Sequence, residues 1–268
     1  MTTHLFASTW DEALHCAMTR DAVVVGGGTS VQPWLTSTGT EPSVLVYLRD
    51  VPGAWSVVPA DSLPDATAHS AGRLRVGAMV SVADPILRPL FGGTEPSWFA
   101  TPAVRRRATV VGNVVSPLGP RELVPVLAAC GAQLVVMGEY GTRMVEVTSI
   151  PTAGLGAGEI ACGLELCDPE RVAFRRVALR PSVSRSEVAV AAAVGDGCGA
   201  TVSIGVGGPT LRLEGAEECL RDPGGAEDFA DACVRSCLAA GDVDPKTLQL
   251  VSGMAERVHR DLHNPKGV

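Results

Sequence analysis

The sequence lacks the features that mark several classes of protein. Aromatic residues make up only 4% of its 268 residues, so a core must be built mainly from Val, Leu and Ala. The longest basic cluster is Arg105–Arg107 in a chain of net charge −7, which argues against a nucleic-acid-binding face. No apolar run reaches the ~18 residues of a membrane span, and residues 1–10 do not resemble a secretory signal. We therefore expect a cytoplasmic protein that binds neither nucleic acid nor membrane.

Metal-binding patterns are also missing. The eight cysteines include no CxxC pair, and their spacing fits neither an iron–sulphur centre nor a zinc site. Cys233 and Cys237 stand one helical turn apart, but two ligands do not make a site. His259 and His263 share the spacing i, i+4 and could bind a metal, although no third ligand is evident. Small buried thiols, exposed surface histidines and no metal site are the expectation.

Helix and strand signals alternate along the chain, which contains 46% hydrophobic residues and enough Gly and Pro for many turns. The expected elements are a helix capped by Ser8, strands at 22–25, 44–48, 74–76, 133–137 and 201–206, a loop at 102–108, and helices at 122–130, 226–240 and 246–263. A glycine-rich stretch at 154–158 marks a boundary, after which two amphipathic helices end the chain.

Three glycines, Gly26–Gly28, follow the first predicted strand and form a turn that has no side chains. Successive N–H groups in such a turn can cradle a pyrophosphate, and a following Thr and Ser add hydroxyl donors. The turn is neither a GxGxxG fingerprint, since Val31 and Pro33 follow in place of a third glycine that opens a helix, nor a P-loop, since no Lys follows. Taken alone it is more often a plain turn. The candidate phosphate-binding residues here are Val25, Gly26, Gly27, Gly28, Thr29, Ser30 and Val31.

Two later stretches carry polar groups suited to a ligand. Thr109 and Asn113 offer side-chain hydrogen bonds, and Gly112 permits close approach of the backbone, although this apolar segment is easily a strand end. Glu122 stands at a predicted helix start, where the helix dipole favours a carboxylate. It could also accept a hydrogen bond from a ribose or another ligand hydroxyl.

The order and spacing of these stretches resemble the FAD-binding medium subunit of the xanthine dehydrogenase and carbon monoxide dehydrogenase group. The family motif close to AGGTxL is matched by Gly26–Val31, and the motif qIRNxATIGGN by Ala103–Asn113. Further matches in register are Leu74–Ala78, Pro125–Ala132, Leu155–Ile160, Ala173–Arg180 and Ile204–Pro209. The similarity therefore covers nearly the whole chain.

The resemblance implies an α+β fold: a two-lobed, PCMH-like FAD-binding fold, as in vanillyl-alcohol-oxidase-type flavoproteins, with a C-terminal α+β domain. The implied domains are 1–55 and 56–168 for the two lobes and 169–268 for the C-terminal domain. FAD would lie between the lobes, with its pyrophosphate on the two glycine-containing loops. The residues that the resemblance adds to the cofactor site are Phe99, Thr109, Val111, Gly112, Asn113, Glu122 and, near the flavin, Arg175.

In this family a molybdenum subunit oxidises the substrate, and FAD receives the electrons through [2Fe–2S] centres. The resemblance thus implies an oxidoreductase subunit, without a catalytic acid or base of its own, that joins a molybdopterin-binding large subunit and a [2Fe–2S] small subunit. A stand-alone FAD-dependent dehydrogenase or oxidase of a small molecule, and a scaffold that has lost FAD, stay open. The main departure is Val111, which replaces a glycine and is expected to crowd a phosphate.

Overall fold

The computed structural model describes residues 1–66, 68–180, 184–205 and 208–264. The chain divides into two compact units. The first contains Met1–Asp84, Thr101–Arg121 and Gln133–Leu166, and the second contains Pro85–Ala100, Glu122–Ala132 and Cys167–Val268. The three-domain boundaries expected from the sequence stay a prediction. Among the described residues, no helix is both long and apolar enough to cross a membrane.

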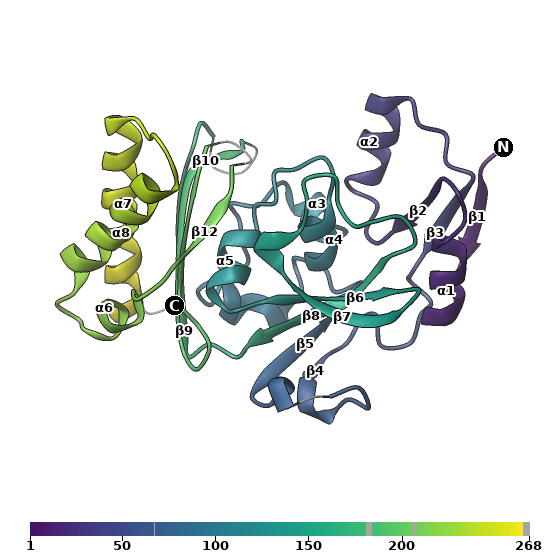
Figure 1. Ribbon diagram of the computed structural model, residues 1–268, viewed down its shortest axis with the longest axis horizontal. Helices are drawn as coiled ribbons and strands as arrows, with labels where there is room; N and C mark the ends of the chain where they lie inside the picture. Colours follow the sequence, from purple (N-terminus) through teal and green to yellow (C-terminus); the bar gives the residue numbers. More distant parts are fainter. Residues whose placement is uncertain (67, 181–183, 206–207, 265–268) are drawn as a thin grey trace. The chain divides into compact units, whose positions relative to one another are not determined.

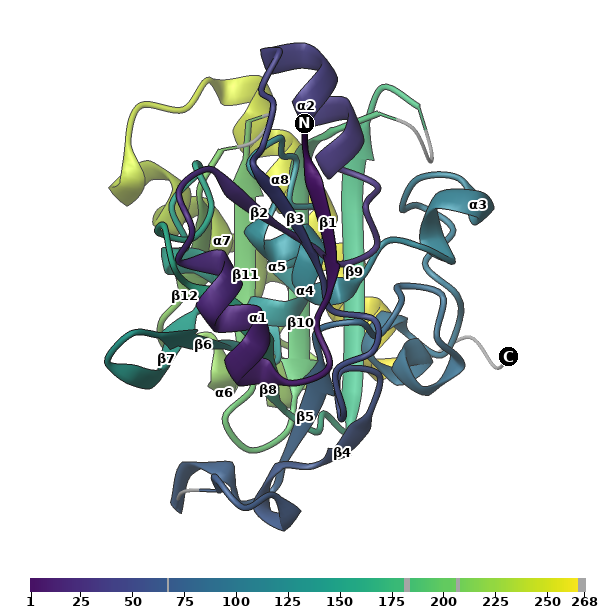
Figure 2. The same ribbon diagram turned by 90° about the vertical axis from the view of Figure 1, so that its right-hand side faces the viewer.

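The first unit begins with a small parallel sheet. Its strands are β1 (Thr3–Phe6), β2 (Ala22–Val25) and β3 (Val44–Tyr47), and β3 lies in the centre (Figure 2). Helices α1 (Trp10–Ala17) and α2 (Val31–Thr38) provide the crossovers that parallel strands require. The predicted strand at 22–25 is confirmed, whereas α2 was not among the predicted elements.

The start of α1 differs by one residue from the expected start. Thr9, and not Ser8, is the N-cap, because its side chain accepts a hydrogen bond from the N–H of Glu12 at 3.1 Å. The carboxylate of Glu12 in turn accepts hydrogen bonds from the N–H and the hydroxyl of Ser8. These bonds lower the pKa of Glu12, with the backbone N–H of Ser8 as the largest cause. Ser8 therefore supports the cap from outside the helix.

A second, five-stranded sheet completes the first unit, in the order β4-β5-β8-β6-β7. Its strands are β4 (Val57–Pro59), β5 (Arg73–Gly77), β6 (Gln133–Gly138), β7 (Gly141–Glu146) and β8 (Ile160–Cys167), with short 3₁₀ turns at Ala60–Ser62, Ala68–Ser70 and Val147–Ser149. The strands predicted at 74–76 and 133–137 are confirmed within β5 and β6.

Two short helices of this unit were not expected. Residues 102–108, predicted as a loop, contain α3 (Pro102–Arg105), and α4 spans Val110–Val115. Thr101 caps α3 by accepting a hydrogen bond from the N–H of Val104. Pro102 stands at the first helical position, where its missing N–H costs nothing.

The second unit is built on an antiparallel sheet in the order β12-β11-β10-β9. Its elements are the 3₁₀ helix η3 (Pro85–Phe91), α5 (Val124–Ala129), β9 (Arg171–Ala178), β10 (Ser186–Val194), β11 (Ala200–Ile204), β12 (Thr210–Leu213), α6 (Glu217–Arg221), α7 (Ala226–Ala240) and α8 (Pro245–His263). Figure 1 shows α7 and α8 on one face of this sheet and α5 on the other. The helix predicted at 226–240 is confirmed, and the strand predicted at 201–206 is β11, with its residue 206 outside the described residues.

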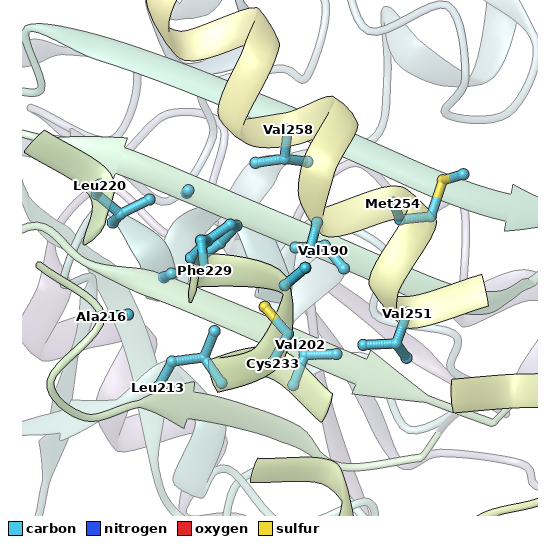
Figure 3. Close-up of a cluster of buried hydrophobic side chains, with 14 of the residues drawn as sticks. Val190, Val202, Leu213, Ala216, Leu220, Phe229, Cys233, Val251, Met254 and Val258 are labelled. Carbon is cyan, nitrogen blue, oxygen red and sulfur yellow. The ribbon is translucent and has the colours of Figure 1, made fainter. Parts of the chain in front are cut away.

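The core of this unit lies between the sheet and its two long helices (Figure 3). Phe229 and Cys233 of α7 and Val258 of α8 are fully buried, and they pack against Val190 and Val202 of the sheet. Their burial confirms that the two predicted helices are amphipathic. Complete burial of side chains of this size contributes about 1.5–3 kcal/mol each, so this packing fixes both helices on the sheet.

Candidate cofactor-binding site

The glycine-rich stretch connects a strand to a helix in the first unit. β2 ends at Val25, and α2 begins at Val31 with Ser30 at its N-cap. Gly28 has a φ of 74°, which glycine adopts without strain. Pro33 lies in the first turn of α2, where no intrahelical N–H is needed, and so does not prevent the helix. The site is thus a strand, a glycine loop and a helix start.

This loop offers a run of free hydrogen-bond donors. Within the described ranges, the backbone N–H groups of residues 26–31 donate no hydrogen bond, and Ser30 makes no side-chain cap to α2. All of these residues are half-buried. Consecutive N–H groups at the positive end of a helix favour an oxyanion such as the diphosphate of a dinucleotide. The loop therefore fits the group that the sequence predicts for it.

The second predicted loop packs directly against the first. A Cβ atom added to Gly26 would lie 3.1 Å from Oγ1 of Thr109, and one added to Gly27 would lie 1.7 Å from the carbonyl oxygen of Arg107. The same Cβ at Gly27 would be 3.2 Å from Cα of Ala108. Gly27 is therefore required by the contact between the two loops themselves. The structure brings these two glycine-containing sequences together, although about eighty residues of chain separate them.

Thr109 begins α4, so this segment is a helix start and not a strand end. Its Oγ1 accepts a hydrogen bond from the N–H of Gly112 at 2.9 Å, and its carbonyl accepts one from the N–H of Asn113 at 3.0 Å. A Cβ at Gly112 would lie 2.6 Å from Oγ1 of Thr109. Glycine is needed at 112 because a larger residue would overlap with the Thr109 side chain that caps the first turn of α4.

Val111 does not have the strained backbone conformation that was expected from the sequence. It lies in α4 with an ordinary negative φ, and its side chain is only 3% exposed. The expected strain of a β-branched residue at positive φ therefore does not arise. The Val111 side chain is thus packed inside the unit, and the N–H of Val111 donates no hydrogen bond in the described part of the chain.

Replacing Val111 with Gly should destabilise the protein and leave FAD affinity unchanged within about twofold. The variant loses a buried side chain, worth about 1.5–3 kcal/mol, and places Gly in a helix, which costs about 1 kcal/mol. The N–H that could face a phosphate is already available in the wild type. Urea unfolding and FAD titration measure the two effects separately. Tighter FAD binding by Val111→Gly would show that the side chain does restrict the site.

Phe99 belongs to an aromatic cluster of the second unit. It is 8% exposed and meets Trp98 edge-on, with ring centroids 6.3 Å apart. Trp98 lies closer to Phe174, at 4.4 Å, and the guanidinium of Arg176 is 6.0 Å from its ring. Trp98 is half-buried and so more accessible than Phe99. Trp98 was not among the residues predicted from the sequence, although it is one of only four tryptophans and adjoins the predicted Phe99.

Glu122 is held by groups of its own unit. Its Oε1 accepts a hydrogen bond from the N–H of Ser186 at 2.8 Å, and its Oε2 accepts from Arg176 at 3.0 Å and from the hydroxyl of Ser186. The Glu122 and Arg176 side chains are only 10% and 6% exposed. Three protein donors thus occupy a carboxylate that can accept about four hydrogen bonds. Most of its accepting capacity serves the fold and is not free for a ribose.

Arg175, expected near the flavin, forms an ion pair at the surface of the second unit. Its Nε lies 2.6 Å from the carboxylate of Asp261 on α8, and half of its side chain is exposed. The adjacent Arg176 points to the opposite face of β9, because side chains alternate along a strand. The role of Arg175 toward the cofactor stays a prediction.

His259 and His263 are not the exposed histidines that the sequence suggests. His259 is 1% exposed, and its Nε2 lies 3.0 Å and 2.9 Å from the carbonyl oxygens of Cys219 and Asp222. Nε2 of His263 lies 3.0 Å from the carbonyl of Leu220. Both rings thus cap the last carbonyls of α6. Within the described ranges no three His, Cys, Asp or Glu side chains are grouped to hold a metal, and all eight cysteines are free.

Residues 2–154 match the sequence model of the family described as FAD binding domain in molybdopterin dehydrogenase. Subunit alpha of the 6-hydroxypseudooxynicotine dehydrogenase complex from Paenarthrobacter nicotinovorans is 28% identical over 133 residues. This match covers 48% of the chain and 43% of the relative, so it spans less than half of the relative's length.

Solved structures share the fold over nearly the whole chain. Quinoline 2-oxidoreductase from Pseudomonas putida 86 superposes with a TM-score of 0.68 at 22% identity, over 98% of this chain and 95% of that one. The cyanide-inactivated Cu,Mo-CO dehydrogenase gives a TM-score of 0.72 at 18% identity, over 98% and 97% of the two chains. These likenesses confirm the predicted α+β, FAD-binding fold. Since the family match covers more than half of its residues, the chain belongs to the FAD-binding domains of molybdopterin dehydrogenases.

Proposed function

We propose that this chain is the FAD-binding subunit of a molybdenum-hydroxylase-type dehydrogenase. It would pass electrons from partner subunits that carry molybdenum and [2Fe–2S] centres to a terminal acceptor. The observation that carries the proposal is the run of free N–H groups at residues 26–31, with the Thr109 loop packed beside it. FAD, when bound, supplies the redox chemistry, since its ring can accept and release electrons. The protein supplies binding and orientation.

Each part of the loop pair has a distinct role in this proposal. The N–H groups of Gly26–Val31 hold the diphosphate, and the hydroxyls of Thr29 and Ser30 add donors to the same group. Thr109, Gly112 and the N–H of Val111 form the second wall. Val25 and Asn113 flank these loops, and Phe99, Glu122 and Arg175 are proposed cofactor residues of the second unit by resemblance alone.

Membership of a complex rests on the relatives. The Paenarthrobacter relative is itself subunit alpha of a dehydrogenase complex. By analogy, the partners proposed here are a molybdopterin-binding large subunit and a [2Fe–2S] small subunit. The cytoplasmic location and the lack of nucleic-acid or membrane partners stay predictions.

Co-expression with the chains encoded beside it tests the proposal. We expect a complex that survives gel filtration and whose bound FAD is reduced by the substrate of the complex, while the isolated chain binds FAD but is not reduced by that substrate. Reduction of the isolated chain by a small molecule would favour the stand-alone dehydrogenase or oxidase. If the isolated chain is colourless once unbound FAD has been removed, the scaffold that has lost its cofactor would be favoured.

A further inference from the structure

A pocket of about 280 Å³ lies in the second unit, on the side of the sheet where the β10–β11 connection meets α6. The connection contributes Asp196, Gly197 and Cys198, β12 contributes Arg212, and α6 contributes Leu220 and Arg221. None of these residues belongs to the FAD loops of the first unit. The volume is slightly below the roughly 300–1,000 Å³ that is typical of small-molecule sites.

The charges of this pocket favour an anion. Arg212 and Arg221 line it together, and neither has a carboxylate partner among the residues that the structure describes. Arg212 makes one long hydrogen bond, of 3.4 Å, to the carbonyl of Gly197. Asp196 also lines the pocket, and all three residues are exposed, so the lining carries two positive charges and one negative charge. A guanidinium without a carboxylate partner is suited to bind a carboxylate or a phosphate.

The connection that borders the pocket adds further donors. The N–H groups of Asp196 and Gly197 donate no hydrogen bond to any part of the chain that the structure describes. Gly197 has a φ of 74°, and a Cβ there would lie 2.7 Å from the sulphur of Cys167. The tight turn that presents these N–H groups therefore depends on glycine at 197.

The thiol in the pocket is not reactive. A hydrogen bond with Cys167, followed by burial, raises the pKa of Cys198 far above its usual range. A neutral thiol is a weak nucleophile, so a ligand would bind here without a covalent bond. The wall formed by α6 is itself fixed, because His259 and His263 bind the carbonyls of Cys219 and Leu220.

We propose that this pocket, which is formed by residues of the second unit alone, is a second ligand site of the protein and binds a small molecule through a carboxylate or phosphate group. The two guanidinium groups hold the oxyanion.

Amide NMR spectra of the full chain, saturated with FAD and free of phosphate buffer, test this proposal with inorganic phosphate and with succinate as probes. We expect saturable shifts of the Asp196 and Gly197 amide signals with at least one probe. Arg212→Met and Arg221→Met should each weaken this binding by roughly tenfold or more, since each removes a charged hydrogen-bond donor. Bound FAD should not change.

Arg235→Met is the matched control, because Arg235 is an exposed arginine of α7 outside the pocket. It should leave the affinity for either probe unchanged. A response to phosphate alone or to succinate alone identifies which oxyanion the site takes. The proposal is overturned if neither probe gives saturable shifts, or if the Arg212→Met/Arg221→Met double variant binds as tightly as the wild type.

Discussion

Gly27→Ala should remove most FAD binding and lower the stability of the protein by several kcal/mol. The added methyl group would lie 1.7 Å from the carbonyl oxygen of Arg107 and 2.6 Å from its carbonyl carbon. Both are backbone atoms, so no side-chain rotation relieves the overlap and the two loops must separate. Overpacking costs typically about 1–3 kcal/mol, occasionally more, and here it also separates the loops on which the proposed diphosphate site depends.

Two alanine variants serve as controls for Gly27→Ala. At Gly26 the new Cβ meets only the Thr109 side chain, at 3.1 Å, so Gly26→Ala should have a much smaller effect. Gly253 lies within α8 with nothing near its added Cβ, so Gly253→Ala should stabilise the fold by about 1 kcal/mol and leave FAD affinity unchanged. Urea unfolding and FAD titration rank the three variants. Wild-type behaviour of Gly27→Ala would refute the close contact of the loops.

Glu122→Leu should destabilise the second unit by about 3–5 kcal/mol, because it leaves the buried Arg176 guanidinium without its carboxylate. The variant also removes the acceptor for the N–H and hydroxyl of Ser186. Replacing both charged residues, as in Glu122→Leu/Arg176→Met, should recover a large part of this loss, since no unpaired charge is then buried.

The exposed ion pair between Arg143 and Glu159 provides the comparison for Glu122→Leu. Its side chains are 53% and 25% exposed, so Arg143→Met should cost no more than about 1 kcal/mol. Chemical denaturation measures both variants in the same way. If Glu122→Leu costs no more than Arg143→Met, the Glu122 network does not stabilise the unit, and its carboxylate is available for another role.

Helices and strands in which apolar residues repeat at regular spacing could be predicted from the sequence. The face of α7 that carries Phe229 and Cys233 repeats at helical spacing and is buried as expected. By contrast, α2 and α3 each contain a proline, Pro33 and Pro102, in the first turn. Proline is a strong signal for a loop, and only the three-dimensional context shows that it stands where the helix tolerates it.

The candidate site could be predicted in its parts but not in its contacts. The motifs at Gly26–Val31 and Thr109–Asn113 were identified from residue type and order, whereas the need for Gly27 comes from a carbonyl far away in the sequence. The burial of His259 was likewise not predictable, because its carbonyl partners lie on α6 about forty residues earlier in the chain. Local patterns do not contain such long-range contacts.

The most direct test of the central claim compares the binding of FAD, FMN and ADP to the flavin-free protein. If the N–H groups of residues 26–31 hold a diphosphate, FAD should bind at least about tenfold more tightly than FMN, which has a single phosphate, because each charged hydrogen bond contributes about 1.5–3 kcal/mol. ADP, which shares the diphosphate of FAD, should compete with FAD in the same titration. Equal affinities for FAD and FMN, with no competition by ADP, would contradict the account.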